Sequence, residues 1–149
     1  MYLHFPQSEE ENISLAAIAG SELSVTFAPP FIALASLSEE GNIAGVVVLN
    51  NYDSCNIDLT AVGRGAFSLG VVRAICTHVF DNLGCSRITA KTRKSNKVVR
   101  RLLGRHAKFE ATLKNWFGNE DALQFRMCRD ECPWLEKKNG IDTFASRAA

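Results

Sequence analysis

The stretch from residue 82 to 109 combines a strand pattern, a turn and a helix pattern with a concentrated positive charge. Apolar and polar residues alternate in SRITAKT (86–92), RKSN (93–96) is polar, and KVVRRLLGRH (97–106) spaces its apolar residues as a helix does. The stretch holds nine Lys or Arg residues and no acidic residue, whereas residues 1–81 hold two basic and nine acidic residues. The chain is therefore strongly polarised, although its net charge is only +1.

A cluster of cations at a junction between a strand and a helix suits an anionic ligand. The N–H groups and the dipole at the start of the helix add to the charge of the side chains. The other interpretation is a solvated helix face with weak surface ion pairs. The composition of the stretch leaves both interpretations open.

The length and the composition favour one compact domain. With 149 residues, 46% of them apolar, the chain is long enough to bury a substantial core. We expect a single domain over residues 1–135 and a polar, frayed tail over 136–149. The sequence has no apolar run that could span a membrane and no secretory signal at its start, so we expect a cytoplasmic protein without a membrane partner.

The five cysteines are an odd number, which favours reduced thiols over a disulfide framework. Cys128 and Cys132 are four residues apart, but no second pair of Cys or His residues has the spacing of metal ligands. We therefore predict no metal site. Cys85 stands just before a predicted strand and is interpreted as a packing residue, with a role as an acyl carrier as the alternative.

The remaining patterns predict a regular alternation of helices and strands. The first helix covers residues 8–20, with Ser8 as its N-cap and Gly20 at its end. Three strands of an antiparallel meander follow, over residues 29–38, 43–52 and 55–63. After them come a long helix over 66–84, a strand over 86–92, a helix over 95–106 and two strands over 108–117 and 121–130. This order predicts an α/β (α+β) fold with a mixed sheet of six to seven strands, helices on both faces and a ligand site between 55–62 and 86–92, where the strand order switches.

Residues 43–135 resemble the GNAT superfamily of N-acetyltransferases. Within it they resemble the ribosomal-protein-acetylating type and the short acetyltransferase-like proteins of phages and prophages. IAGVVVLNNY and NIDLTAV are similar to the third and fourth strands of the family. RAICTHVFDNLGCSRITAKTRKSNKVVRRLL resembles its helix, strand and Asn-opened helix, and GNEDALQFRMCRDECPWL is similar to the closing strand of phage-type members. The resemblance implies a GNAT-like, mostly antiparallel central sheet.

The resemblance also implies that acetyl-CoA is bound by two devices. The fourth strand pairs with the pantetheine arm, and the loop that opens the next helix cradles the pyrophosphate, for which the family uses Q/R-x-x-G-x-G/A. This chain departs from that pattern, because it has Gly63 where Gln or Arg is expected and Ala66 in the glycine position. Phe67 would have to point away from the cofactor. The implied cofactor-binding residues are Leu59, Thr60, Ala61, Arg64, Gly65, Ala66, Ser68, Asn96 and Arg100.

Transfer of an acetyl group to an amine needs a base, hydrogen-bond donors for the oxyanion and a way for the thiolate to leave. Asp58 on the predicted fourth strand is the candidate catalytic base, with an exposed strand carboxylate as the alternative. The family often uses a tyrosine on the helix after the fifth strand, but the only tyrosines here are Tyr2 and Tyr52. The acceptor would be selected by loops near residues 20–30 and 114–121, which contain no diagnostic charge arrangement.

Three functions remain open. The first is an acyl-CoA-dependent N-acetyltransferase that acts on an amine of a protein or a small molecule. The second is a catalytically silent GNAT-fold phage protein without a cofactor, either a virion component or a partner of a host protein, and a crevice plugged by Phe67 would favour it. The third, a nucleic-acid-binding domain, is the weakest, because no aromatic residues alternate with the Lys and Arg residues from 87 to 105. We also expect that an exposed final strand could pair with a second copy.

Overall fold

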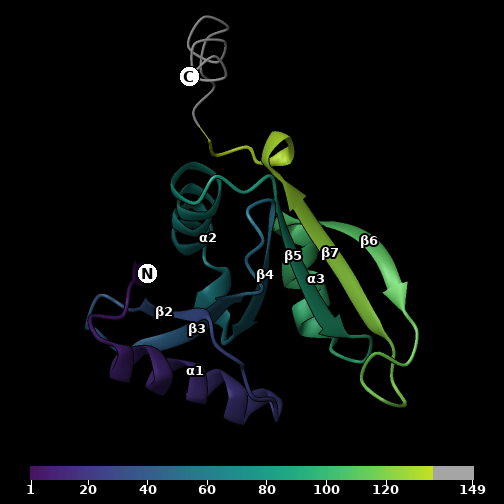
Figure 1. The fold of residues 1–149 in the computed structure, drawn as a ribbon, viewed down its shortest axis with the longest axis horizontal. Coiled ribbons are helices and arrows are strands. Elements are labelled where there is room, and N and C mark those ends of the chain that lie inside the picture. The colour runs from purple at the N-terminus through teal and green to yellow at the C-terminus, as the bar shows by residue number, and fades with distance from the viewer. Residues whose placement is uncertain (136–149) are drawn as a thin grey trace, which may run out of the picture.

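The computed structural model describes residues 1–135 and contains one seven-stranded sheet in the order β1-β2-β3-β4-β5-β7-β6 (Figure 1). All neighbouring strands are antiparallel except β4 and β5, which are parallel. The strands are β1 Tyr2–His4, β2 Phe31–Leu37, β3 Ile43–Asn50, β4 Asn56–Val62, β5 Arg87–Arg93, β6 Lys108–Leu113 and β7 Ala122–Cys128. The helices are α1 Glu9–Leu23, α2 Leu69–Cys76 and α3 Lys97–His106. In the described part of the chain, no helix has the length and apolarity needed to cross a membrane.

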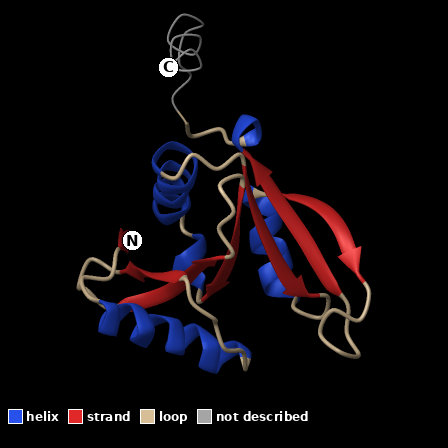
Figure 2. Cartoon of the chain, in the orientation of Figure 1, coloured by secondary structure: helices blue, strands red, loops and turns tan. Residues whose placement is uncertain are grey.

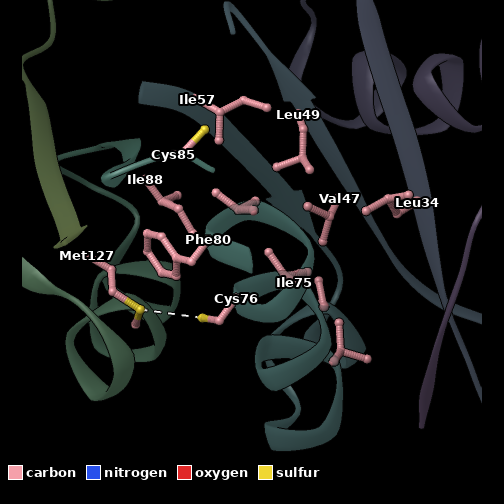
Figure 3. Close-up of a cluster of buried hydrophobic side chains, with 13 residues drawn as sticks. Leu34, Val47, Leu49, Ile57, Ile75, Cys76, Phe80, Cys85, Ile88 and Met127 are labelled. Carbon is pink, nitrogen blue, oxygen red and sulfur yellow. Dashed lines mark hydrogen bonds between the residues drawn. The ribbon is translucent and has the colours of Figure 1, made fainter. Parts of the chain in front are cut away.

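Helices cover both faces of the sheet, as predicted (Figure 2). On one face, Leu15 and Ala19 of α1 pack with Val46 and Val48 of β3. On the other face, residues of α2 pack with strand residues around Val47 (Figure 3). Because alternate residues of β3 are buried on opposite faces, the strand has the continuous apolar sequence that is typical of a fully covered strand.

Helix α1 is longer than predicted. The Ser8 side chain caps it as expected and accepts a hydrogen bond of 3.1 Å from the Glu11 N–H group. The helix continues past Gly20 to Leu23 and ends at Ser24, which has a left-handed φ of 56°. A Cβ atom on Gly20 would lie 2.6 Å from the carbonyl oxygen of Val25. The glycine therefore allows the returning chain to pass close to the helix, and it does not end the helix.

The long helix predicted for residues 66–84 is divided into three parts. A 3₁₀ turn at Arg64–Phe67 precedes α2, and a π-helical turn at Thr77–Asn82 follows it. Ser68 separates the first two parts because its backbone is extended, with a ψ of 147°. The π turn is closed by a hydrogen bond of 2.9 Å from the Leu83 N–H group to the His78 carbonyl group. Of the six apolar residues predicted for the buried face, Ile75, Cys76, Val79 and Phe80 are buried, whereas Val72 and Leu83 are half-buried.

The two ends of the sheet also differ from the prediction. The short strand β1, which pairs with β2, was not predicted. The last two strands are shorter than expected, and residues 114–121 connect them. The final strand β7 lies between β5 and β6, so the prediction of an exposed final strand is wrong. The edge strands of the sheet are β1 and β6. The predicted tail, 136–149, lies outside the described residues.

Candidate functional site

The parallel strands β4 and β5 are paired only over their first halves. Their register runs from Asn56 opposite Arg87 to Leu59 opposite Ala90, and no pairs follow. The strands then separate, as Figure 1 shows. Within residues 1–135, the backbone groups of residues 60–62 that point toward β5 therefore have no partner strand, although residues 60–62 pair with β3 on the other side. The separation contributes to a cleft of about 560 Å³, at the predicted switch in strand order.

Residues from both faces of the sheet line this cleft. On β4, Ile57 packs with the cluster under α2 and Val62 packs with the cluster under α1. Because side chains alternate along a strand, Asp58 and Thr60 lie on the α1 side. The rim on that side is formed by Glu22 and Leu23 at the end of α1, by residues 25–27 after it, and by Trp116 and Phe117 in the loop between β6 and β7. The two loops predicted to select the acceptor therefore border the cleft.

Asp58 is held in place by side-chain amides. One of its carboxylate oxygens accepts a hydrogen bond of 2.9 Å from Asn51 Nδ2, and the other accepts one of 3.1 Å from Asn56 Nδ2. The Oδ1 atom of Asn56 in turn accepts a hydrogen bond of 2.6 Å from the Thr89 hydroxyl group. This network connects β4 and β5 just before they separate. It fixes the orientation of a half-buried carboxylate at the edge of the cleft.

The start of α3 contributes Asn96 to the cleft. The Asn96 side chain is the N-cap of the helix and accepts a hydrogen bond of 3.2 Å from the Val99 N–H group. Arg100, one turn further, does not line the cleft. Its guanidinium group donates to the Lys94 carbonyl oxygen at 2.9 Å, and it borders a separate groove beside Phe109. Of the residues implied by the resemblance, the cleft thus brings together Asp58, Leu59, Thr60, Ala61 and Asn96.

The loop between β4 and α2 has small residues for a reason that the sequence did not reveal. A Cβ atom on Gly63 would lie 2.7 Å from the Ala44 carbonyl oxygen, and one on Gly65 would lie 2.6 Å from the Ala44 Cβ atom. Close packing of the loop against β3 therefore requires both glycines. Ala66 lines a small apolar cavity instead of the cleft, and Arg64 is exposed outside it.

The N-terminus of α2 contains a polar group without a partner. The hydroxyl group of Ser68 is buried and forms no hydrogen bond within the described chain. The N–H groups of residues 69–71, in the first turn of the helix, have no acceptor within the helix. An orphaned hydroxyl group beside free N–H groups at a helix N-terminus is compatible with an anionic group such as a phosphate.

The resemblance required Phe67 to point away from the cofactor, but Phe67 lines the cleft. Its side chain packs against the core under α2 and against a cluster that includes Ala90 and Leu103. It therefore forms a wall that the cleft shares with the apolar cavity of about 60 Å³. The His106 Nε2 atom lies 3.2 Å from the Phe67 carbonyl oxygen and connects this loop to α3. Phe67 narrows the site, but a cleft of about 560 Å³ remains beside it.

The cations of residues 82–109 have different environments. Arg87 pairs with Glu110, Arg93 with Glu120 and Lys108 with Glu131, so these three belong to surface ion pairs. Within residues 1–135, Lys91 has no ion pair. Its Nζ atom lies 5.1 Å from the centroid of the Trp116 ring.

Arg93, like Lys91, lies beside an aromatic ring that is distant in sequence. Its guanidinium group is 4.4 Å from the centroid of the Phe117 ring. The absence of aromatic residues between the Lys and Arg residues was therefore a poor reason to reject nucleic-acid binding. Three of the nine cations are neutralised by ion pairs within residues 1–135, and the low rank of nucleic-acid binding among the three functions stays a prediction.

An ion pair near the C-terminal end of β7 gives a prediction for stability against pH. The Lys108 ammonium group, 2.9 Å from the Glu131 carboxylate, and hydrogen bonds from Cys128 lower the pKa of Glu131 to about 2. Because the pKa is lower in the folded state, the stabilisation is present above the ordinary pKa of about 4.5. It is lost as the pH falls toward 2. We expect Glu131→Gln to reduce the loss of stability between pH 4.5 and 2, measured by urea unfolding.

The control for this prediction is Glu39→Gln, which changes an exposed glutamate in the turn between β2 and β3. This variant should keep the pH dependence of the unmodified protein. An unchanged pH profile for Glu131→Gln would contradict the assignment.

Cys85 and His78 are both affected by burial. Cys85 is 1% exposed, and burial raises the pKa of its thiol, which keeps the thiol protonated. Its interpretation as a packing residue therefore holds. Burial lowers the pKa of His78, whose ring packs against Phe5 at a centroid distance of 4.9 Å.

Comparisons with known proteins identify the fold. No protein-family model matches the chain, and no curated protein matches it. A dodecameric spermidine N-acetyltransferase from Vibrio cholerae superposes with a TM-score of 0.71 and 11% identity, over 87% of this chain and 94% of that chain. A GNAT-family acetyltransferase from Bacillus anthracis superposes with a TM-score of 0.57 and 17% identity, over 66% of this chain and 67% of that chain. The chain thus has the fold of GNAT acetyltransferases, as predicted, whereas the resemblance to phage-type members stays a prediction.

Proposed function

We propose that the protein is an acyl-CoA-dependent N-acetyltransferase, which transfers the acetyl group of acetyl-CoA to an amine of a small molecule or a protein. The observation that carries this proposal is the separation of β4 from β5. It leaves an unpaired strand edge at residues 60–62 and places the Asp58 carboxylate beside the same cleft. The likeness to acetyltransferase structures supports the proposal through the fold alone.

The cleft has the features needed to bind an extended cofactor. The amide groups of a pantetheine arm could pair with the free edge of β4 at Thr60 and Ala61, as an added strand would, directly after Leu59, the last residue of β4 that pairs with β5. The diphosphate would then lie toward the N-terminus of α2, where the Ser68 hydroxyl group has no partner. Arg64, exposed on the same loop, would add positive charge.

Three of the residues implied by the resemblance receive a different role in this proposal. Gly65 and Ala66 allow the loop to pack closely against β3. Arg100 borders a separate groove, so it would act on the cofactor only through its charge. Asn96 keeps its place beside the pantetheine arm because it lines the cleft.

Asp58 would act as the general base. The acceptor nitrogen forms a bond to the carbonyl carbon of the acetyl group, the bond from that carbon to sulfur breaks, and the proton of the amine passes to the carboxylate, directly or through water. Acetyl-CoA would supply the acetyl group as a thioester. Among residues 1–135, no tyrosine lines the cleft, and the Tyr52 hydroxyl group donates to the Leu83 carbonyl group elsewhere. An alkyl thiol has a pKa of about 8.5, so its sulfur can leave as a thiolate without a proton donor.

Thermal unfolding with and without acetyl-CoA tests the binding step. A ligand at one hundred times its Kd adds about 2.7 kcal/mol to the stability, which is a rise of roughly 5–10 °C in Tm for a chain of this size. ATP is the control, because it carries adenosine and phosphates but no pantetheine arm. We expect a much smaller shift with ATP. Equal shifts with both compounds would indicate that only surface charge is recognised, and no shift with acetyl-CoA would favour the catalytically silent alternative.

The oligomeric state, the acceptor and the location of the protein in the cell belong to this proposal as well. The Vibrio cholerae neighbour is described as dodecameric, which supports a homo-oligomer for this chain. The edge strands β1 and β6 are available for such contacts. A phage or host protein as partner, and a location in the cytoplasm or in a virion, stay predictions from the resemblance.

A further inference from the structure

We infer that the acceptor is an amine that also carries a carboxylate or phosphate group, and that Lys91 binds this anionic group. The inference rests on the proposed acetyltransferase function and names the chemical class of its acceptor. It is carried by three observations: the shared face of Asp58 and Lys91, the absence of an ion pair at Lys91 within residues 1–135, and the charges of the other residues that line the cleft.

Asp58 and Lys91 lie on the same face of the sheet, on the two strands that separate. Asp58 is opposite Thr89 in the parallel register, and Lys91 is the next residue of β5 on that face. With a rise of about 3.3 Å per residue and strands about 4.8 Å apart, their Cα atoms are roughly 8 Å from each other. An amine near Asp58 would therefore place a second group, a few bonds away, within reach of the long Lys91 side chain.

The charge of Lys91 is available to a ligand. Within residues 1–135 no carboxylate forms an ion pair with it, whereas Arg93 is paired with Glu120 at 3.4 Å. Lys91 is half-buried, and its ammonium group is held beside the exposed ring of Trp116. A carboxylate or phosphate group on the acceptor could form the charge-assisted contact that Lys91 does not have within residues 1–135.

The other charges of the cleft disfavour a polycationic acceptor. Among the described residues that line it, the only carboxylates are Asp58 and the exposed Glu22, and Asp58 already accepts two amide hydrogen bonds. A polyamine such as spermidine could place one ammonium group near Asp58. Its remaining ammonium groups would then approach Lys91 and Arg93, where like charges repel. This chain is thus expected to differ in acceptor from its spermidine-acetylating structural neighbours.

The reaction on such an acceptor balances. The ammonium form of the acceptor and acetyl-CoA give an N-acetyl amide, the free thiol of CoA and one proton, and the anionic group remains unchanged. The role of Lys91 is to position the acceptor through that group. Its removal should therefore raise the KM for an anionic acceptor and leave the chemical step largely intact.

The test compares amines that differ only in charge, at saturating acetyl-CoA. The probes are a tripeptide amide that begins with glutamate, its isostere that begins with glutamine, a third that begins with phosphoserine, and spermidine. We expect kcat/KM for the glutamate or the phosphoserine peptide to exceed that for the glutamine peptide by about tenfold through KM, as one charge-assisted contact provides. Whichever anionic peptide reacts faster identifies the anionic group. Spermidine should be the poorest acceptor.

Variants of Lys91 make the assignment specific. Lys91→Met should reduce the ratio of kcat/KM for the anionic peptides to that for the glutamine peptide to near one. Lys91→Arg should retain the preference, and Lys91→Glu should favour spermidine. Lys94→Met, which removes an exposed cation outside the cleft, is the matched control. Equal reactivity of the charged and neutral peptides, a preference for spermidine, or no effect of Lys91→Met would overturn the inference.

The same experiment separates this inference from the proposed function. If acetyl-CoA stabilises the protein and amines are acetylated without regard to charge, the acetyltransferase function stands and the role of Lys91 is rejected. If acetyl-CoA does not bind and no amine is acetylated, both are rejected.

Discussion

Replacing Asp58 by asparagine is expected to lower kcat of acetyl transfer by about 10²–10⁴-fold, the usual contribution of a positioned general base. The asparagine has nearly the same shape and still lines the cleft, but it cannot accept a proton from the ammonium group of the acceptor. Asn51 and Asn56 each donate a hydrogen bond to one carboxylate oxygen of Asp58 in the unmodified protein. The asparagine keeps only one of these two acceptor oxygens, so one hydrogen bond is lost. The stability should therefore fall by only about 1 kcal/mol, the value of one lost hydrogen bond.

The dependence on pH distinguishes a base from a residue that only binds the acceptor. When the pH approaches the pKa of the amine, part of the acceptor is already deprotonated, so the deficit of Asp58→Asn should decrease. Asp81→Asn is the matched control, since Asp81 pairs with Arg129 outside the cleft. Acetyl-CoA should stabilise both variants as it stabilises the unmodified protein. An unchanged kcat for Asp58→Asn would rule out Asp58 as the base.

Replacing Phe80 by alanine is expected to destabilise the fold by about 3–5 kcal/mol, as for other fully buried phenylalanines. Phe80 lies in the π-helical turn after α2, is 1% exposed, and packs with Ile88 and Met127 in the core that Figure 3 shows. Its removal would leave a cavity between the helix and β5, which neighbouring side chains could fill only in part. Urea unfolding measures the loss directly.

Phe109→Ala is the control for this core prediction. Phe109 lies on the edge strand β6 and is 55% exposed, so its replacement removes little buried surface. We expect a loss below about 1 kcal/mol, mainly from its edge-to-face contact with Phe125. Similar losses for both variants would show that the core is not centred on Phe80.

Local patterns predicted much of the fold. The alternation in residues 86–92 and the helical spacing in 97–106 correspond to β5 and α3, with Asn96 as the N-cap. The meander of β2, β3 and β4 followed from three apolar runs separated by turns. In these segments the side-chain period and the capping residues act over a few neighbours, so the sequence alone is sufficient.

Features that depend on distant contacts could not be predicted. The need for glycine at 63 and 65 comes from the approach of β3, and Gly20 stays inside α1 because Val25 returns beside it. The position of Trp116 over Lys91 depends on the path of the loop after β6. Phe67 was recognised as an obstacle in the phosphate-binding loop, but its packing between two clusters depends on the positions of α2 and α3.

Binding of acetyl-CoA in the cleft between β4 and β5 is tested residue by residue by backbone amide chemical shifts, followed by NMR during titration with acetyl-CoA. We expect the largest changes at residues 59–62 of β4 and at 67–71 around the start of α2. Changes confined to the exposed groove beside Arg100, or no changes at all, would contradict it.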